Sequence, residues 1–243
     1  MSDNFIQNTN EDDKELKTGM VAIIGRPSAG KSTFLNTACQ EEVSIVSPIP
    51  QTTRNAIKGI VNTSFGQLIF IDTPGYHDSD KKLNLRLKNV TETQLEDIDC
   101  VLYVLDSTRV PGNEEIHTAQ LIKKHANKTV IAINKIDSKE SKIQPIRRFI
   151  KDTLPQIPQE RIFEMSAQKD IGINEVLKAL YDIAPIAPPM YSEDDYTDQD
   201  LAFRIAEAIR GEAINRLADE LPHAVYVDIA DVEKRNEGKK LWV

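Results

Sequence analysis

The chain has 243 residues, with 40% apolar and 28% charged side chains and a formal net charge of −8 at pH 7, which is typical of a globular protein with one large domain, or one plus a smaller one. No apolar run approaches the ~20 residues of a membrane-spanning helix, and the polar, acidic N-terminus is unlike a signal or transit peptide. Two cysteines are too few for a disulfide framework, so we expect a reduced, cytoplasmic protein, and its acidic charge is untypical of nucleic-acid binders.

The charge is spread unevenly along the chain and suggests a domain organisation. Residues 1–18 carry a net charge of −3 and show no hydrophobic period, which predicts a disordered acidic tail. Residues 19–184 have a net charge of only +1 and form the predicted main domain. The remaining residues carry −6. Within them, residues 185–199 contain three prolines and predict an extended linker, followed by a smaller module at 200–243.

Short apolar runs alternate with helical patterns between residues 19 and 184. The expected strands are Met20–Ile24, Ala56–Asn62, Gln67–Ile71, Val101–Leu105, Thr129–Ile133 and Arg161–Met165. The expected helices are Lys31–Gln40, Asn84–Asp97, Glu114–Ala126, Ile143–Leu154 and Asn174–Ile183. This alternation predicts an α/β fold with a mostly parallel six-stranded sheet, helices on both faces and one hairpin across Phe65 and Gly66. Ligands of such sheets bind at the carboxyl ends of the strands.

The first expected strand is followed by the pattern G-x-x-x-x-G-K-[ST], a phosphate-binding P-loop. Its glycines let successive backbone N–H groups turn towards phosphate oxygens, and the next helix adds the positive end of its dipole. Lys31 would place its ammonium on the β- and γ-phosphates, and the Ser32 hydroxyl would bind Mg²⁺. A plain strand-to-helix turn is the alternative interpretation. The residues of the loop are Gly25, Arg26, Pro27, Ser28, Ala29, Gly30, Lys31 and Ser32.

A D-x-x-G pattern follows the third expected strand and consists of Asp72, Thr73, Pro74 and Gly75. In isolation this pattern fits a tight turn equally well, because proline and glycine both favour one. Its place at a strand end downstream of a P-loop favours a nucleotide role instead. Asp72 would then hold Mg²⁺ through a water, and the Gly75 N–H would contact the γ-phosphate and sense whether it is present.

An N-K-x-D pattern of Asn134, Lys135, Ile136 and Asp137 follows the fifth strand. The Asp137 carboxylate can accept hydrogen bonds from guanine N1–H and from its amino group, whereas adenine offers neither donor and would leave the carboxylate unpaired. The Lys135 stem can lie over the base plane. The alternative interpretation of Asp137 is a helix N-cap.

The last expected strand is followed by Ser166 and Ala167. A short loop of small residues can bring a backbone N–H close to the guanine O6. The same pair also fits an ordinary helix N-cap. Its interpretation as a nucleotide element therefore depends on its being the fourth element in this order.

The four motifs, in this order and at these strand ends, resemble those of the P-loop GTPases of the translation-factor-like superclass. Two further stretches narrow the resemblance to the Era GTPases: residues 44–60 are similar to the family's switch I region, and residues 188–225 to its linker and the opening of its KH domain. The resemblance covers residues 19–243. It implies a bacterial GTPase that hydrolyses GTP to GDP with Mg²⁺.

The same resemblance assigns roles to individual residues. It implies that Lys31, Thr53 and Gly75 act in catalysis and that Ser32, Thr53 and Asp72 hold the metal ion. Thr52 is an alternative to Thr53, and either threonine can equally be the start of a strand. The aromatic residue after D-x-x-G, Tyr76, belongs to the same nucleotide-binding loop.

Two positions depart from related GTPases. Tyr76 stands where Ras-like GTPases have the glutamine that positions the attacking water, and a phenol replaces an amide poorly there. We therefore expect slow intrinsic hydrolysis until a partner orders the switches. Ser28 stands where several relatives have an asparagine that ligates K⁺, and a hydroxyl is a weaker ligand than an amide oxygen. Whether K⁺ acts as a further cofactor is left open.

The C-terminal module reads as helix, strand, strand. Apolar residues follow one helical face between Asp200 and Glu220, the segment Val225–Ile229 alternates like a half-buried strand, and residues 241–243 begin another. This order is similar to the start of a type II KH domain, which grips single-stranded RNA with a G-x-x-G loop. The sequence contains no G-x-x-G. A KH domain also needs further helices and a third strand, so we expect an incomplete KH domain in a truncated chain; loss of RNA binding is the alternative.

The resemblance also implies partners. They are GTP and GDP, 16S rRNA near its 3′ end and the 30S ribosomal subunit, in whose processing and assembly the protein would act as a switch. It implies a cytoplasmic monomer with peripheral association at the inner membrane. Two alternatives stay open. One is a nucleotide-gated RNA-binding scaffold that barely turns GTP over, and the other is a different GTPase of the same superclass.

Overall fold

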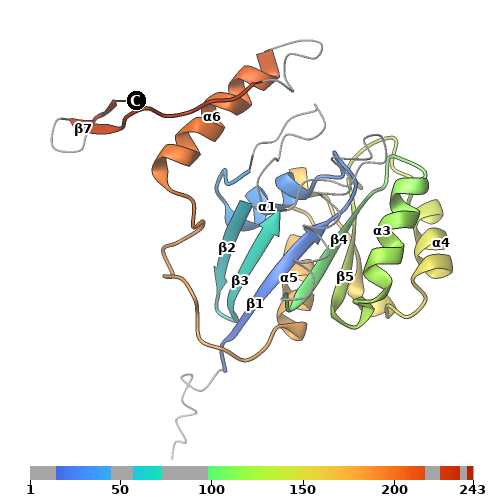
Figure 1. Ribbon diagram of the computed structural model, residues 1–243. Coiled ribbons are helices and arrows are strands. Elements are labelled where there is room, and N and C mark those ends of the chain that lie inside the picture. The colour runs from blue at the N-terminus through green and yellow to red at the C-terminus, as the bar shows by residue number, and fades with distance from the viewer. Residues whose placement is uncertain (1–14, 45–56, 73–97, 217–224, 236–239, 243) are drawn as a thin grey trace, which may run out of the picture.

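A central sheet organises the chain, as Figure 1 shows. The computed structural model describes residues 15–44, 57–72, 98–216, 225–235 and 240–242. In these residues the main sheet has six strands in the order β2-β3-β1-β4-β5-β6. Neighbouring strands are parallel except for β2 and β3, which are antiparallel. The predicted mostly parallel α/β sheet is confirmed.

The observed strands and helices match most of the predicted ones. The strands of the sheet are β1 (Lys17–Ile24), β2 (Ile57–Thr63), β3 (Gly66–Asp72), β4 (Cys100–Asp106), β5 (Thr129–Asn134) and β6 (Ile162–Glu164). The helices are α1 (Lys31–Cys39), α3 (Asn113–Lys123), α4 (Ile143–Thr153), α5 (Ile173–Ile183) and α6 (Leu201–Arg216), with 3₁₀ turns at Ala126–Lys128, Gln159–Arg161 and Ala167–Lys169. The helix predicted at 84–97 lies outside the described residues.

Alternating side chains of the central strands build two separate cores. In β4, Leu102 and Val104 face the core that α1 and α5 cover, while Tyr103 and Leu105 face the core under α3 and α4. All seven residues of β4 are buried. A parallel strand covered on both faces has no polar side, because helices pack against each of them. The continuous apolar runs of the sequence therefore mark the centre of the sheet.

The first strand begins at Lys17, three residues earlier than its apolar run predicts, so the prediction of a disordered tail up to residue 18 is wrong at its end; residues 1–14 lie outside the described residues. The backbone N–H of Lys17 donates to the Phe65 carbonyl at 3.0 Å, and the Thr18 N–H donates to the Pro185 carbonyl at 3.0 Å. These partners lie far away in the sequence, so local hydrophobicity could not reveal them. The hairpin predicted across Phe65 and Gly66 is confirmed, since β2 and β3 pair from Thr63 and Gly66 outwards.

Residues 185–199 lie extended along the outer edge of the sheet. The Ile60 N–H donates to the Tyr196 carbonyl at 2.8 Å, and the Gln67 amide oxygen accepts from the N–H groups of Met190 and Tyr191 at 2.9 and 3.0 Å. The amide of Asn62 also donates to three carbonyls of this segment. An uncovered edge strand offers unpaired backbone groups to other chains, and this covering removes part of that edge.

The C-terminal part departs from one prediction. Residues 225–232 form no strand, whereas β7 (Glu233–Arg235) pairs in antiparallel fashion with β8 (Lys240–Trp242). The strand expected at Val225–Ile229 is therefore wrong, although its alternation of half-buried and exposed residues is present. Alternation alone makes no strand, because a strand also needs a neighbour to accept and donate hydrogen bonds.

The helix α6 stands beyond the β2 edge, apart from the helices that cover the sheet (Figure 1). Its residues Arg204, Glu207 and Gly211 line a crevice with Asn36 and Val43, which lie at the end of α1 and just after it. None of the helices in the described ranges is both long and apolar enough to cross a bilayer.

Candidate functional site

The P-loop joins β1 to α1 by a turn that needs its glycines. A Cβ on Gly25 would lie 2.5 Å from the Val104 carbonyl oxygen, so only glycine lets the loop pass β4 this closely. Gly30 has a φ of +97°, and a Cβ there would lie 2.1 Å from the Asn134 amide nitrogen. Close packing of the loop against β4 and Asn134 thus requires both glycines, which holds for a plain strand-to-helix turn as well as for a P-loop. A glycine-rich turn that leads into a helix N-terminus is compatible with phosphate binding.

Lys31 reaches back over this loop. Its ammonium donates to the carbonyls of Gly25 and Arg26 at 3.1 and 3.0 Å, and the residue is only 7% exposed. Lys31 is also the first residue of α1, whose N-terminal dipole end favours anions. A buried positive charge at a helix N-terminus, ringed by backbone groups, suits a bound phosphate.

Arg26 anchors the loop to α3. Its guanidinium contacts Glu115 at 2.9 Å and Glu114 at 3.5 Å, both in the first turn of α3. The second oxygen of Glu115 accepts the Gly112 N–H at 2.8 Å and so caps the same helix. Since Glu115 is buried, this contact fixes the loop and the start of α3 relative to each other.

One side chain ties three strand-end loops together. The Asn134 amide donates to the Ala29 carbonyl of the P-loop at 2.9 Å, and its oxygen accepts the Ala167 N–H at 2.9 Å. Asn134 itself ends β5 and is 2% exposed. Thr37 of α1 adds a second link, because its hydroxyl donates to the Ala167 carbonyl at 2.8 Å. The structure thus brings three of the four predicted motifs to one edge of the sheet.

Asp137 faces the loop that follows β6. Its carboxylate accepts a hydrogen bond from the Ser166 hydroxyl at 2.6 Å. The alternative that Asp137 caps a helix is wrong, since α4 begins only at Ile143 with Lys142 as its N-cap residue. Ser166 does serve as an N-cap, because its oxygen accepts the Lys169 N–H. The Ser166 hydroxyl can therefore do both at once, because it donates to the Asp137 carboxylate and accepts from the Lys169 N–H.

Asp106 belongs to this edge and was not among the predicted residues. It ends β4 beside Asn134 and is 3% exposed. Its carboxylate accepts from the Lys135 ammonium at 2.7 Å and from the hydroxyl and N–H of Thr108 at 2.6 and 2.9 Å. Burial raises the pKa of this carboxyl, but the hydrogen bonds from Lys135 and Thr108 outweigh it, so the pKa lies below its usual value.

Several predicted residues lie outside the described ranges. They are Thr52, Thr53, Thr73, Pro74, Gly75 and Tyr76. Asp72 is placed by its backbone alone, as the last residue of β3, where it is the register partner of Ile23 in β1. The carboxyl end of β3 therefore lies next to the start of the P-loop. Asp72 therefore lies at the same edge of the sheet as the P-loop, which contains Ser32. A Mg²⁺ site shared by these two residues would require them to lie at the same edge.

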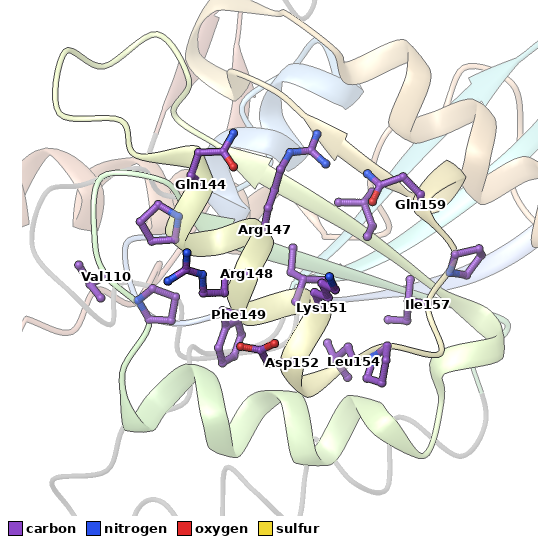
Figure 2. Close-up of a pocket in the computed structure, with 16 residues that line it drawn as sticks. Val110, Gln144, Arg147, Arg148, Phe149, Lys151, Asp152, Leu154, Ile157 and Gln159 are labelled. Carbon is purple, nitrogen blue, oxygen red and sulfur yellow. The ribbon is translucent and has the colours of Figure 1, made fainter.

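A hollow surface elsewhere on the domain surrounds α4 (Figure 2). Basic side chains of α4, apolar residues of the following loop and the Val110 loop before α3 line it. Arg147, one of these residues, pairs with Glu164 at 2.6 Å. Among the motif residues that the structure describes, none lines this surface, which lies apart from the described strand-end loops.

The chain is similar to characterised GTPases along most of its length. Residues 20–135 match the family model described as 50S ribosome-binding GTPase. GTPase Era of Treponema denticola is 56% identical over 94% of this chain and 78% of its own length. The chain belongs to the Era GTPase family. GTPase Era of Borreliella afzelii is 43% identical over 92% of this chain and 76% of the relative.

Solved Era structures share the fold. A variant of Aquifex aeolicus Era bound to GDP and AlF4⁻ superposes with a TM-score of 0.82 at 31% identity, over 91% of this chain and 75% of that one. Era in complex with MgGDPNP and nucleotides 1506–1542 of 16S ribosomal RNA superposes with the same TM-score, identity and coverage. As an Era GTPase, the protein binds GTP and hydrolyses it to GDP.

Proposed function

We propose that this Era GTPase uses GTP and Mg²⁺ as a switch in 16S rRNA processing and 30S ribosomal subunit assembly in the cytoplasm. The observation that supports the rRNA role is its likeness to Era solved with MgGDPNP and 16S rRNA nucleotides, at a TM-score of 0.82 over 91% of the chain. We infer that the nucleotide-binding domain, predicted from residue 19, begins with β1 at Lys17 and extends to residue 184, and that residues 200–243 belong to an RNA-binding module.

Each strand-end loop would bind a different part of the nucleotide. The P-loop would hold the phosphates, with Lys31 exchanging its two carbonyl partners for the β- and γ-phosphate oxygens. Asp137 and Lys135 would recognise guanine, and the loop of Ser166 and Ala167 would close its far side. Asn134 keeps these loops in register. The base and the phosphates would thus bind to loops that hydrogen bonds already hold together.

Ser32, Asp72 and Thr53 are the residues that we assign to Mg²⁺. The site fits a hard cation, because hydroxyl and carboxylate oxygens are its preferred ligands and because Asp72 ends the strand beside the P-loop. When bound, Mg²⁺ would neutralise charge that develops on the phosphate oxygens. Lys31 would stabilise the same charge, and the Gly75 N–H would contact the γ-phosphate.

Intrinsic hydrolysis should be slow and should accelerate on the small ribosomal subunit. The Tyr76 phenol has a single hydroxyl, whereas a glutamine amide donates to and accepts from the attacking water through two separate atoms, so a partner would have to order the site. Single-turnover hydrolysis tests this when it is measured with the protein alone, with purified 30S subunits and with purified 50S subunits. We expect about tenfold or greater stimulation by 30S subunits and none by 50S subunits. An equal rate in all three samples would contradict the proposal and favour a scaffold that barely turns GTP over.

Potassium should affect hydrolysis little in the wild-type protein. Ser28 offers a short hydroxyl at a position with a φ of +59°, whereas a K⁺-ligating asparagine there would offer an amide oxygen. Asparagine tolerates positive φ well, so Ser28→Asn is a matched gain-of-function variant. Turnover in KCl and in NaCl should agree within about twofold for the wild type and diverge for Ser28→Asn. A strong K⁺ preference of the wild type would overturn this expectation.

A further inference from the structure

A buried carboxylate stands beside the proposed guanine site without belonging to any of its motifs. Asp106 is the last residue of β4, and its register partner in β5 is Asn134, which opens the N-K-x-D loop. The residue is 3% exposed. An acidic side chain is seldom buried this completely unless its charge has partners. The hydrogen-bond partners of the Asp106 carboxylate therefore indicate its role.

Both oxygens of Asp106 are engaged, each by a different residue. One oxygen accepts the Thr108 hydroxyl and the Thr108 N–H at 2.6 and 2.9 Å. The other accepts the Lys135 ammonium at 2.7 Å. The Thr108 contacts fix the orientation of the carboxylate, so that the second oxygen presents a fixed point to the lysine. Charge-assisted hydrogen bonds of this kind are among the stronger ones in proteins.

Lys135 is held at both of its ends. Its backbone has a φ of +65°, which is uncommon for a lysine and persists only where the surroundings impose it. Its carbonyl accepts the Ser138 N–H at 3.1 Å, and the next residue, Ile136, donates its N–H to the Met165 carbonyl at 3.3 Å. With the ammonium fixed by Asp106, the methylene stem spans two fixed points, and a third of the side chain stays exposed.

We propose that Asp106 is a positioning residue for guanine recognition, which holds the Lys135 stem as a preformed platform for the plane of the base. This inference rests on the proposed role of the N-K-x-D loop. A free lysine would lose rotamer freedom when the base arrives, whereas a lysine already fixed by a buried carboxylate has lost it beforehand. Asp106 contributes to nucleotide affinity without touching the nucleotide.

Asparagine is the informative replacement because it keeps the shape of Asp106 but replaces one of its two accepting oxygens with a donor. A carboxylate accepts on both sides, while an amide has one accepting oxygen and one donating nitrogen. The side-chain NH₂ of the Asp106→Asn variant would therefore point at another hydrogen-bond donor, either the Thr108 hydroxyl and N–H or the Lys135 ammonium. In both cases the lysine loses its fixed partner or the partner loses its orientation.

The experiment measures equilibrium dissociation constants for GDP and GTP with four variants. They are Asp106→Asn, Lys135→Met, the double variant, and Asp99→Asn as the matched control. Asp99 directly precedes β4 and accepts the Met20 N–H at 2.8 Å, so it is an aspartate at the opposite end of the same strand. Melting temperature and single-turnover hydrolysis of bound GTP are followed in each variant.

We expect Asp106→Asn to weaken GDP and GTP about tenfold alike, a loss of ~1.4 kcal/mol, with hydrolysis of bound GTP and the affinity of Asp99→Asn unchanged. The double variant should bind no more weakly than Lys135→Met alone. Losses that add in full, or a loss for GTP only, would show that Asp106 acts otherwise. Failure of the guanine site itself would appear separately, as a wild-type protein without preference for GDP over ADP.

Discussion

Replacing Asp137 with asparagine should weaken GTP binding by about 100-fold or more and create a preference for XTP. Hydrogen bonds to a charged acceptor contribute about 1.5–3 kcal/mol each, and the proposed contact to guanine has two of them. Xanthine carries a carbonyl oxygen where guanine has its amino group, so the asparagine amide can donate to it. Binding constants for GTP, XTP and ATP measure the change directly.

The structure makes this substitution mild for the fold. The Ser166 hydroxyl donates to the Asp137 carboxylate at 2.6 Å, and an asparagine oxygen can accept the same bond. Asp152→Asn on the exposed side of α4 is a suitable control and should leave nucleotide preference unchanged. If Asp137→Asn kept its full preference for GTP over XTP, the assignment of Asp137 to the base would be wrong.

Replacing Lys31 with methionine should lower kcat/KM for GTP hydrolysis by about 100-fold or more. Removing one donor aimed at charge that develops in a transition state typically costs about 10²–10³-fold in rate. The Lys31 ammonium is buried in the P-loop beside the carbonyls of Gly25 and Arg26. Methionine keeps the length of the stem but carries no charge. Steady-state hydrolysis, with the melting temperature as a check of folding, measures the effect.

A second lysine provides the control at the opposite end of β1. Lys17 also donates to two backbone carbonyls, those of Tyr181 and Asp182, at 2.8 and 3.3 Å. Lys17→Met removes the same kind of contact from the amino end of the sheet, and it should leave hydrolysis within about twofold of the wild type because ligands bind at the carboxyl ends of the strands. Equal losses in the two variants would mean that Lys31 supports only the fold.

The sequence predicts the centre of the fold well because the relevant information is local. An apolar run such as Val101–Leu105 identifies a strand that is covered on both faces, and the structure buries all of β4. The P-loop glycines were recognisable by spacing, and crowding at Gly25 and Gly30 shows the physical reason for them. Because apolar runs locate the strands, they also locate the strand ends, where binding residues are expected.

The features that the sequence does not predict depend on contacts between residues that are distant in the sequence. Asp106 is a single aspartate after an apolar run, and nothing nearby reveals that Lys135, 29 residues away, is its partner. Only its position at a strand end could have signalled a role. Likewise, the contacts of Tyr191 and Met190 with Gln67 in β3 join segments more than 120 residues apart. Alternation at Val225–Ile229 predicts a strand that the structure does not contain, because alternation reflects burial and not the hydrogen-bonded pairing that defines a strand.

Recognition of guanine by Asp137 underlies the proposed function, and the preference of the wild-type chain between GDP and ADP shows whether it occurs. Equilibrium titration of the purified protein with fluorescent GDP and ADP gives the two dissociation constants under one set of conditions. Adenine leaves the Asp137 carboxylate without its two donors, so we predict that GDP binds about 10³-fold more tightly than ADP, or more. An ADP affinity within about tenfold of that for GDP would mean that Asp137 does not recognise guanine.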